Sequence, residues 1–297
     1  MLLIEAINAF VEDVAGWKRN ETPKSYRAKL RRLLEEFPHR SLKTISLDDL
    51  NKLKRGMMGR CSPYTVKSVL TTIKHFFKWA SENGLIKQDP ALKLKIPLPP
   101  PPDPKAVAPE TVEALIETAS AHGEAWETTR NVAILYWLRD TGGRACGLIS
   151  ARLSGLDLRR GRCTVVEKDR PRVLYLNTPT ITAIKLWLRE REFLDPLTDH
   201  LFISYNTRAG LSRSGLTNIL RTLKNDAGIK SRCNPHSFRH AFARDCLRNH
   251  ADLSQVSQLL GHSTITVTAA YYARWADHEL KRVHHLVSPG RKLKVPG

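Results

Sequence analysis

A run of prolines between residues 97 and 104 divides the 297-residue chain into two parts. Proline fixes its own φ and lacks a backbone N–H, so such a run cannot continue a helix and forms a semi-rigid extended spacer. A ligand for an SH3-type domain is the alternative interpretation, but the position between two basic helical regions favours a spacer. We therefore expect a helical domain over residues 1–96, a proline-rich linker over 97–105 and a second domain over 106–297.

Residues 1–96 have the apolar spacing of helices. Helix starts are predicted at Thr22-Pro23, at Ser46 or Asp48 and at Ser62-Pro63, and Asn83-Gly84 ends the last and longest helix. Its polar face and that of the second helix are basic, and the residues that we single out there are Lys24, Arg27, Arg31, Lys67 and Lys74. Two basic helices in one small domain indicate contact with a DNA backbone, although lysines on a polar face are often simply solvated.

The second part combines helices with one β-hairpin. Helices are expected from Pro109, over about 126–140, from Thr178-Pro179 and from Ser212. The β-branched runs 163–166 and 173–176 flank the polar segment 167–171, which predicts two strands joined by a turn. The whole chain is therefore expected to be mainly α, with a mixed α/β second domain that holds a small β-sheet or hairpin.

The charge balance indicates a polyanionic partner. Lys and Arg number 48 against 29 Asp and Glu, which gives a net charge of +19. In a protein with 41% hydrophobic residues, enough for a core, such an excess points to nucleic acid, or otherwise to a basic, well-solvated surface. No apolar run is long enough for a membrane span, and the N-terminus lacks the basic region of a signal peptide. The five scattered cysteines predict neither disulfides nor a zinc site, so we expect a reducing, cytoplasmic location.

The segment 234–243 carries the most specific pattern in the chain. His236 and Arg239 lie at i and i+3 after a helix-starting Pro235, so they share one helix face and are expected to point outward, opposite an apolar stripe. A second short helix is predicted over 253–260 and ends at Gly261. His262 follows directly, and Tyr271 comes nine positions later.

These residue types suit one reaction. The planar guanidinium of arginine grips a phosphate through two hydrogen bonds. A tyrosine hydroxyl becomes a nucleophile when a neighbouring base or cation helps to remove its proton, and histidine serves as that base near neutral pH. Together they indicate attack of a tyrosine on a phosphodiester.

With these motifs the chain resembles the tyrosine recombinases, the phage-integrase and Xer-type enzymes. The resemblance rests on His236-Ser-Phe-Arg239, on Leu-Leu-Gly-His262 with Tyr271 after it, and on Thr141-Gly-Gly-Arg144, which resembles the Thr-Gly-x-Arg motif of the family. Residues 1–96 are similar to the helical, SAM-like core-binding domain that precedes the catalytic domain of these enzymes.

The resemblance implies a site-specific recombinase that cuts DNA through a 3′-phosphotyrosine and exchanges strands through a Holliday junction. It implies that Tyr271 attacks, that Arg144 and Arg239 hold the phosphate, and that His236 and His262 assist. Lys168 on the hairpin would be the general acid. Further implications are a double-stranded DNA core site, a dimer on each site and a tetramer in the synapse, with no metal and no other cofactor.

Three positions leave alternatives open. The family has an acidic residue three places after its first arginine, but this chain has Gly147, so another group or water must orient Arg144. The hairpin tip is about one residue shorter than the family pattern, which leaves Arg170 as the alternative to Lys168, or as a residue that only binds DNA. Tyr272 lies about 100° around a helix from Tyr271, and the spacing from His262 favours Tyr271.

Other functions share parts of this sequence pattern. A DNA-binding protein of the same fold with weakened catalysis would agree with Gly147 and the short hairpin. A type IB topoisomerase uses related chemistry, but the histidine motifs favour a recombinase. A metal-dependent hydrolase is disfavoured because no acidic cluster accompanies the histidines.

Overall fold

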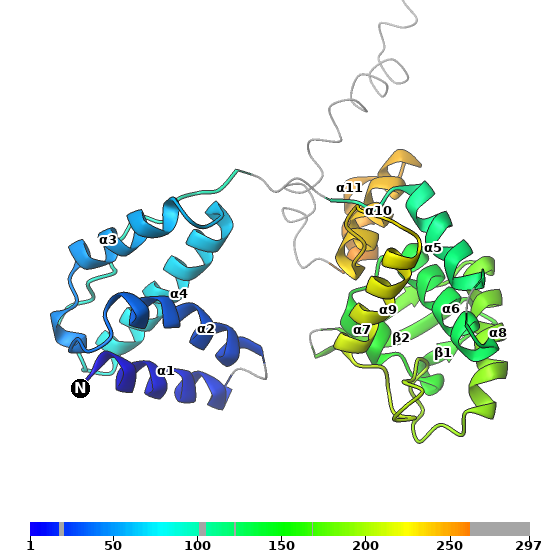
Figure 1. Ribbon diagram of the computed structural model, residues 1–297, viewed down its shortest axis with the longest axis horizontal. Coiled ribbons are helices and arrows are strands. Elements are labelled where there is room, and N and C mark those ends of the chain that lie inside the picture. The colour runs from blue at the N-terminus through cyan, green and yellow to red at the C-terminus, as the bar shows by residue number, and fades with distance from the viewer. Residues whose placement is uncertain (18–20, 101–104, 122, 168, 262–297) are drawn as a thin grey trace, which may run out of the picture. The chain divides into compact units, whose positions relative to one another are not determined.

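The chain forms two compact units in a computed structural model that describes all residues except 18–20, 101–104, 122, 168 and 262–297 (Figure 1). The first unit is Met1–Pro102 and the second is Asp103–Gly297. Each unit has its own hydrophobic core.

The N-terminal unit is helical, and two of its helices begin at caps that the sequence predicts. Its elements are α1 (Leu3–Trp17), α2 (Glu21–Glu36), the 3₁₀ turn η1 (Leu42–Thr44), α3 (Leu47–Met58) and α4 (Pro63–Glu82). Ser46 caps α3 in a capping box with Asp49, and the Ser62 hydroxyl accepts from the backbone N–H of Thr65 at the start of α4. These side chains satisfy N–H groups that have no partner within the helix, and so they fix where each helix starts.

The core of this unit lies between α1, α2 and α4, which pack side by side (Figure 1). The Phe10 ring of α1 contacts the rings of Tyr26 on α2 and of Phe76 and Trp79 on α4. The Trp79 indole N–H also donates to the Asp13 carboxylate at 2.8 Å. This aromatic packing therefore fixes α2 and α4, and with them their basic polar faces, relative to each other.

The C-terminal unit surrounds a central helix with further helices and a small sheet. Its elements are α5 (Pro109–Ala121), α6 (Ala125–Thr141), α7 (Ala145–Ser150), the 3₁₀ turn η2 (Leu153–Gly155), β1 (Leu156–Asp157), β2 (Arg162–Glu167), β3 (Arg170–Tyr175), α8 (Thr178–Phe193), α9 (Arg213–Asp226), α10 (Pro235–Arg248) and α11 (Leu253–Leu260). Helix α6 is the central one: it packs against α5, α8 and α10, and its Trp137 is fully buried against Phe202.

The three strands form an antiparallel sheet in the order β1-β2-β3. Glu167 pairs with Arg170, so the paired strands are separated by only two residues of the chain. The expected turn over 167–171 is therefore too long, because Glu167, Arg170 and Pro171 belong to the strands. Along β2 the side chains of Cys163, Val165 and Glu167 are buried in alternation, as the two-residue period of a strand requires.

The expected fold class, mainly α with a small β-sheet, is confirmed. In the segment 201–204, expected to be a short strand or extended run, the first three residues are buried, and the segment forms one isolated bridge, between Ile203 and Gly210. None of the described helices is long and apolar enough to cross a bilayer.

Candidate active site

Arg144 lies where α6 gives way to α7. Helix α6 ends at Thr141, and Gly142 follows it with a left-handed φ of 57°, which glycine adopts without strain. Arg144 is then the N-cap of α7, as expected from the glycine pair before it. Its side chain is partly exposed, and Nη2 donates to the carbonyl of Gly261 at 3.4 Å.

Glu167 supplies the carboxylate that position 147 lacks. One of its oxygens accepts from the backbone N–H of Arg144 at 2.6 Å, and the other accepts from Arg144 Nη1 at 2.6 Å. Arg172 on β3 donates from Nη1 to this second oxygen, also at 2.6 Å. The Glu167 side chain is only 2% exposed.

The Glu167 carboxyl stays ionised although it is buried. Burial acts to raise its pKa, but the hydrogen bond from the Arg144 backbone and the charges and hydrogen bonds of the two arginines outweigh that effect. The net result is a pKa below the usual value. A buried carboxylate between two guanidinium groups compensates their charge, and removing it would take away the counter-ion that the two groups share.

Arg239 is buried, and not outward-facing as the spacing with His236 suggests. It lies on the first turns of α10 and is 4% exposed. Its Nη1 donates to the carbonyl of Gly142 at 2.8 Å, and its Nη2 donates to the carbonyl of Leu260 at 2.6 Å. The ends of α6 and α11 thus cover a side chain that the helix pattern alone places on the surface.

Three guanidinium groups meet at the last turn of α11. The carbonyls of Leu259, Leu260 and Gly261 accept hydrogen bonds from Arg172, Arg239 and Arg144, one from each. The C-terminal end of a helix carries partial negative charge, and its last carbonyls have no partner within the helix, so it holds cations well. Gly261, with φ of 61°, ends α11 as predicted, and His262 follows it directly in the chain.

His236 stands at the exposed beginning of α10. The Asn234 side chain caps this helix by accepting from the backbone N–H groups of His236 and Ser237, at 3.0 Å and 2.9 Å. The His236 ring lies 4.5 Å from that of His240, between ring centroids. Partial desolvation lowers the pKa of His236, and so do neighbouring guanidinium groups, that of Arg239 first. His236 is thereby kept in its neutral form, which can accept a proton.

The sign of this shift can be tested by titration. We expect the His236 imidazole to titrate below the ordinary value of about 6.5, followed by NMR of its ring protons. Arg232→Ala should raise the midpoint, because one of the positive charges that oppose protonation is removed. The pKa of His236 is higher in the unfolded chain, so the contribution of His236 to stability is lost as the pH falls from the unfolded pKa through the lower, folded pKa. A midpoint at or above 6.5 in the wild type would contradict the assignment.

Three predicted catalytic residues, Lys168, His262 and Tyr271, lie outside the described residues, and so does Tyr272. Of the predicted set, the structure brings together Arg144, Arg239 and His236. Lys168 follows Glu167 in the chain. Arg170, the alternative to Lys168, is exposed at the start of β3. Sequence reasoning missed Glu167 and Arg172, whose signal is the inward alternation of the two strands.

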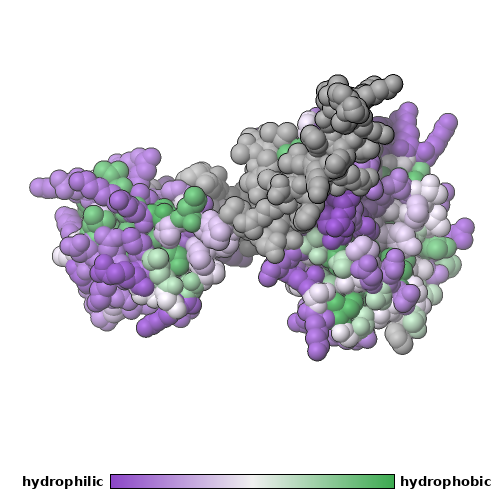
Figure 2. Space-filling model, turned by 90° about the horizontal axis from the view of Figure 1, so that it is seen from above, coloured by the Kyte–Doolittle hydropathy of each residue, from purple (hydrophilic) through white to green (hydrophobic). Residues whose placement is uncertain are grey.

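The predicted DNA-binding residues of the N-terminal unit lie on α2 and α4. Lys24, Arg27, Arg31 and Lys67 are exposed, and Arg31 also pairs with Glu35 at 3.0 Å. Lys74 is half-buried and donates to the carbonyl of Leu92 at 3.1 Å. A hollow between the two helices is lined by side chains that can donate hydrogen bonds: Tyr26, Lys29, Tyr64, Lys67, Ser68, Thr71, Thr72 and His75. Figure 2 shows that hydrophilic residues predominate on the visible face of this unit.

No group of three or more His, Cys, Asp or Glu side chains in the described part of the chain could hold a metal ion. The positively charged site around α11 instead suits an anion with several oxygens. Arginine forks bind phosphate by paired hydrogen bonds, and oriented positive groups stabilise charge that develops on its oxygens.

Comparison with known proteins places the chain in a family. The pattern of the phage integrase family matches residues 105–279, more than half of the chain. The tyrosine recombinase XerC of Alcanivorax borkumensis is 28% identical over 279 residues, which covers 90% of this chain and 89% of that protein.

Two solved structures agree with this assignment. The crystal structure of XerA recombinase is 27% identical, with a TM-score of 0.54, and the match covers 96% of this chain and 99% of that one. XerH site-specific recombinase, bound to palindromic difH substrate in a post-cleavage complex, is 21% identical and shares the fold, with a TM-score of 0.74 over 89% of this chain and 79% of that one. This chain therefore belongs to the phage integrase family of tyrosine recombinases.

Proposed function

We propose that this protein cuts and rejoins double-stranded DNA at a specific site through a 3′-phosphotyrosine intermediate. The observation that carries the proposal is the meeting of Arg144 and Arg239 at the last turn of α11, directly before His262. The family that the chain belongs to supports the same reaction. Strand exchange through a Holliday junction would then integrate, excise or resolve DNA.

In the first step the phenol oxygen of Tyr271 forms a bond to the scissile phosphorus, and the bond from phosphorus to the 5′-oxygen breaks. The guanidinium groups of Arg144 and Arg239 hold the two non-bridging oxygens, where negative charge grows in the transition state. His236 accepts the phenol proton, directly or through water, and its lowered pKa keeps it ready to do so.

Lys168 donates a proton to the departing 5′-oxygen, and His262 donates a hydrogen bond to the phosphate. In the second step the 5′-hydroxyl of another strand attacks the phosphotyrosine and releases Tyr271. The number of phosphodiester bonds is unchanged, so the reaction needs no nucleotide and no other source of energy.

The N-terminal unit would bind the DNA backbone. The hollow between α2 and α4 has lysine ammonium groups and hydroxyl groups of the kind that contact phosphate oxygens without reading sequence. Arg170, exposed on the hairpin, adds a positive charge in the C-terminal unit. A dimer on each site and a tetramer in the synapse, acting in the cytoplasm, complete the proposal.

The alternative of a catalytically weakened DNA-binding protein loses one of its two supports. Gly147 removes the expected acidic residue, but the Glu167 carboxylate pairs with Arg144 from another element of the same unit. The short hairpin remains as the other support.

Covalent capture tests the proposal. A randomised pool of nicked suicide duplexes is incubated with the protein, and adducts that resist denaturation are isolated and sequenced to find the site. On that site the wild type should accumulate the adduct, because the nick lets the 5′-hydroxyl fragment diffuse away. Tyr271→Phe should form none, and Tyr272→Phe should form it as the wild type does.

Each other outcome has a defined meaning. No adduct with the wild type, on DNA that it binds specifically, would favour the weakened DNA-binding protein. An adduct that survives Tyr271→Phe and disappears with Tyr272→Phe would move the nucleophile by one residue. Relaxation of plasmids by the isolated monomer, without exchange between two sites, would favour a topoisomerase.

A further inference from the structure

We propose that Glu167 is the positioning residue of Arg144, and that Gly147 is glycine because the Glu167 carboxylate occupies the space of its side chain. The proposal rests on the proposed function, in which Arg144 holds the scissile phosphate. It assigns to this chain a carboxylate–arginine pair built from the end of β2 and the start of α7.

The contacts fix both the place and the direction of the Arg144 side chain. Glu167 accepts from the backbone N–H of Arg144 with one oxygen and from its Nη1 with the other, both at 2.6 Å. A carboxylate that binds the two ends of one residue limits how the chain between them can turn. The partly exposed guanidinium is thereby held while part of it stays accessible to a phosphate.

Gly147 is explained by this carboxylate and by nothing in its own backbone. It lies within α7, away from the positive-φ region, where glycine is less favourable than alanine. A Cβ placed on it would lie 2.7 Å from Glu167 Oε1 and 3.2 Å from Glu167 Cγ. Any larger residue would therefore push the carboxylate away from Arg144.

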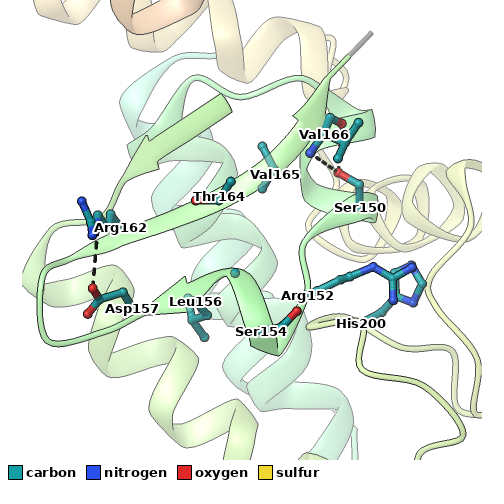
Figure 3. Close-up of a pocket in the computed structure, with 11 residues that line it drawn as sticks. Ser150, Arg152, Ser154, Leu156, Asp157, Arg162, Thr164, Val165, Val166 and His200 are labelled. Atoms are coloured by element: carbon teal, nitrogen blue, oxygen red, sulfur yellow. Dashed lines mark hydrogen bonds and ion pairs between the residues drawn. The ribbon is translucent and has the colours of Figure 1, made fainter. Parts of the chain in front are cut away.

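Hydrogen bonds join strand β2, which carries Glu167, to helix α7, which Arg144 caps (Figure 3). The Ser150 hydroxyl at the end of α7 accepts from the backbone N–H of Val166 and donates to its carbonyl, both at 3.0 Å. Figure 3 shows this hydroxyl directed at the backbone of Val166, one residue before Glu167. The carboxylate is thus presented by a fixed strand and not by the hairpin tip.

Arg172 extends the same contact to α11. It shares one Glu167 oxygen with Arg144, and its Nη2 donates to the carbonyl of Leu259. Through Arg172, the Glu167 carboxylate therefore links Arg144 to the end of α11, which precedes His262. Lys168 follows Glu167 directly in the chain.

The test compares cleavage rates of four variants on the suicide duplex in single turnover. Glu167→Ala should slow adduct formation by about 10²-fold, the usual effect of a misplaced catalytic group. Its affinity for the DNA should not fall, because the change removes a negative charge. Gly147→Ala should slow cleavage in the wild type but have no further effect in Glu167→Ala, since the carboxylate that it displaces is already absent.

The fourth variant tests rescue. In Gly147→Asp with Glu167→Ala, the new carboxylate starts from a Cβ position 2.7 Å from the former Oε1 and can reach Arg144. We expect it to recover at least tenfold of the lost rate. If Glu167 had only a structural role, its replacement would change the melting temperature and not the cleavage rate. The melting temperature of each variant is therefore measured beside its cleavage rate.

A readout without DNA separates this inference from the proposed function. The two Nη nitrogens of Arg144 should give separate NMR signals in the free wild-type protein, because the ion pair slows rotation of the guanidinium. The signals should merge in Glu167→Ala and separate again in the double variant. If the wild type forms no adduct, the recombinase proposal fails and these signals decide the role of Glu167. Unchanged Arg144 signals, or unchanged cleavage, in folded Glu167→Ala would overturn the inference.

Discussion

Arg239→Ala should slow formation of the phosphotyrosine adduct by about 10²–10³-fold, the range found when one donor to a developing oxyanion is removed. The guanidinium is buried, and its two outer nitrogens are bound to the carbonyls of Gly142 and Leu260. These contacts orient the guanidinium before DNA binds, so little free energy is lost in reorienting it when the phosphate arrives. Single-turnover cleavage of the suicide duplex measures the loss.

Arg239→Lys should recover little of that rate. An ammonium is a point charge and cannot reach two carbonyls and a phosphate oxygen with the fixed fork of a guanidinium. Arg248→Ala is the matched control, because Arg248 is an exposed arginine at the other end of the same helix. Cleavage by Arg239→Ala within about tenfold of the wild type would remove Arg239 from the phosphate site.

Local signals in the sequence predict most of the helix ends. Ser62-Pro63 and Gly261 are such signals: a hydroxyl before a proline starts a helix, and a glycine able to adopt positive φ ends one. Local signals also predict where the motif residues lie: Arg144 caps the start of α7, and His236 and Arg239 lie in the first turns of α10. These features depend on neighbours within a few residues.

The burial of Arg239 could not be predicted in this way. Helical spacing with His236 indicates a shared outward face, but the atoms that cover Arg239 belong to Gly142 and Leu260, which are distant in sequence. Which helix ends meet over a given side chain is decided by tertiary packing, and a helical period carries no information about it.

The inward position of Glu167 could have been predicted from the sequence, but the polar residues that follow it made the segment resemble a turn. Cys163 and Val165 establish an inward alternation that Glu167 continues, but the polar run after it resembles a turn. A charged residue on the inward register of a strand calls for a partner, and two arginines provide it. That Glu167 replaces an acid at position 147 required knowing that β2 lies against α7.

Gly142→Ala is expected to lower the free energy of unfolding of the C-terminal unit by about 2–5 kcal/mol. An L-residue in the left-handed region costs about 1–2 kcal/mol, and Gly142 has φ of 57°. Overpacking adds about 1–3 kcal/mol, because the new Cβ would lie 2.3 Å from Cδ1 of the Phe242 ring. Calorimetry should show a fall in melting temperature of about 2–4 °C for each kcal/mol in a domain of this size.

Gly228→Ala separates the two causes. Gly228 lies in the same unit with a φ of 63°, but nothing lies within 4 Å of the position of its Cβ, so only the backbone term applies. Phe242→Leu provides the converse test, since Gly142→Ala should cost only that backbone term once the ring is gone. If Gly142→Ala and Gly228→Ala lower the free energy of unfolding equally, the Phe242 ring moves aside without an additional loss of stability. The carbonyl of Gly142 would then be a poor anchor for Arg239, and the fixed geometry on which the Arg239 prediction depends would be lost.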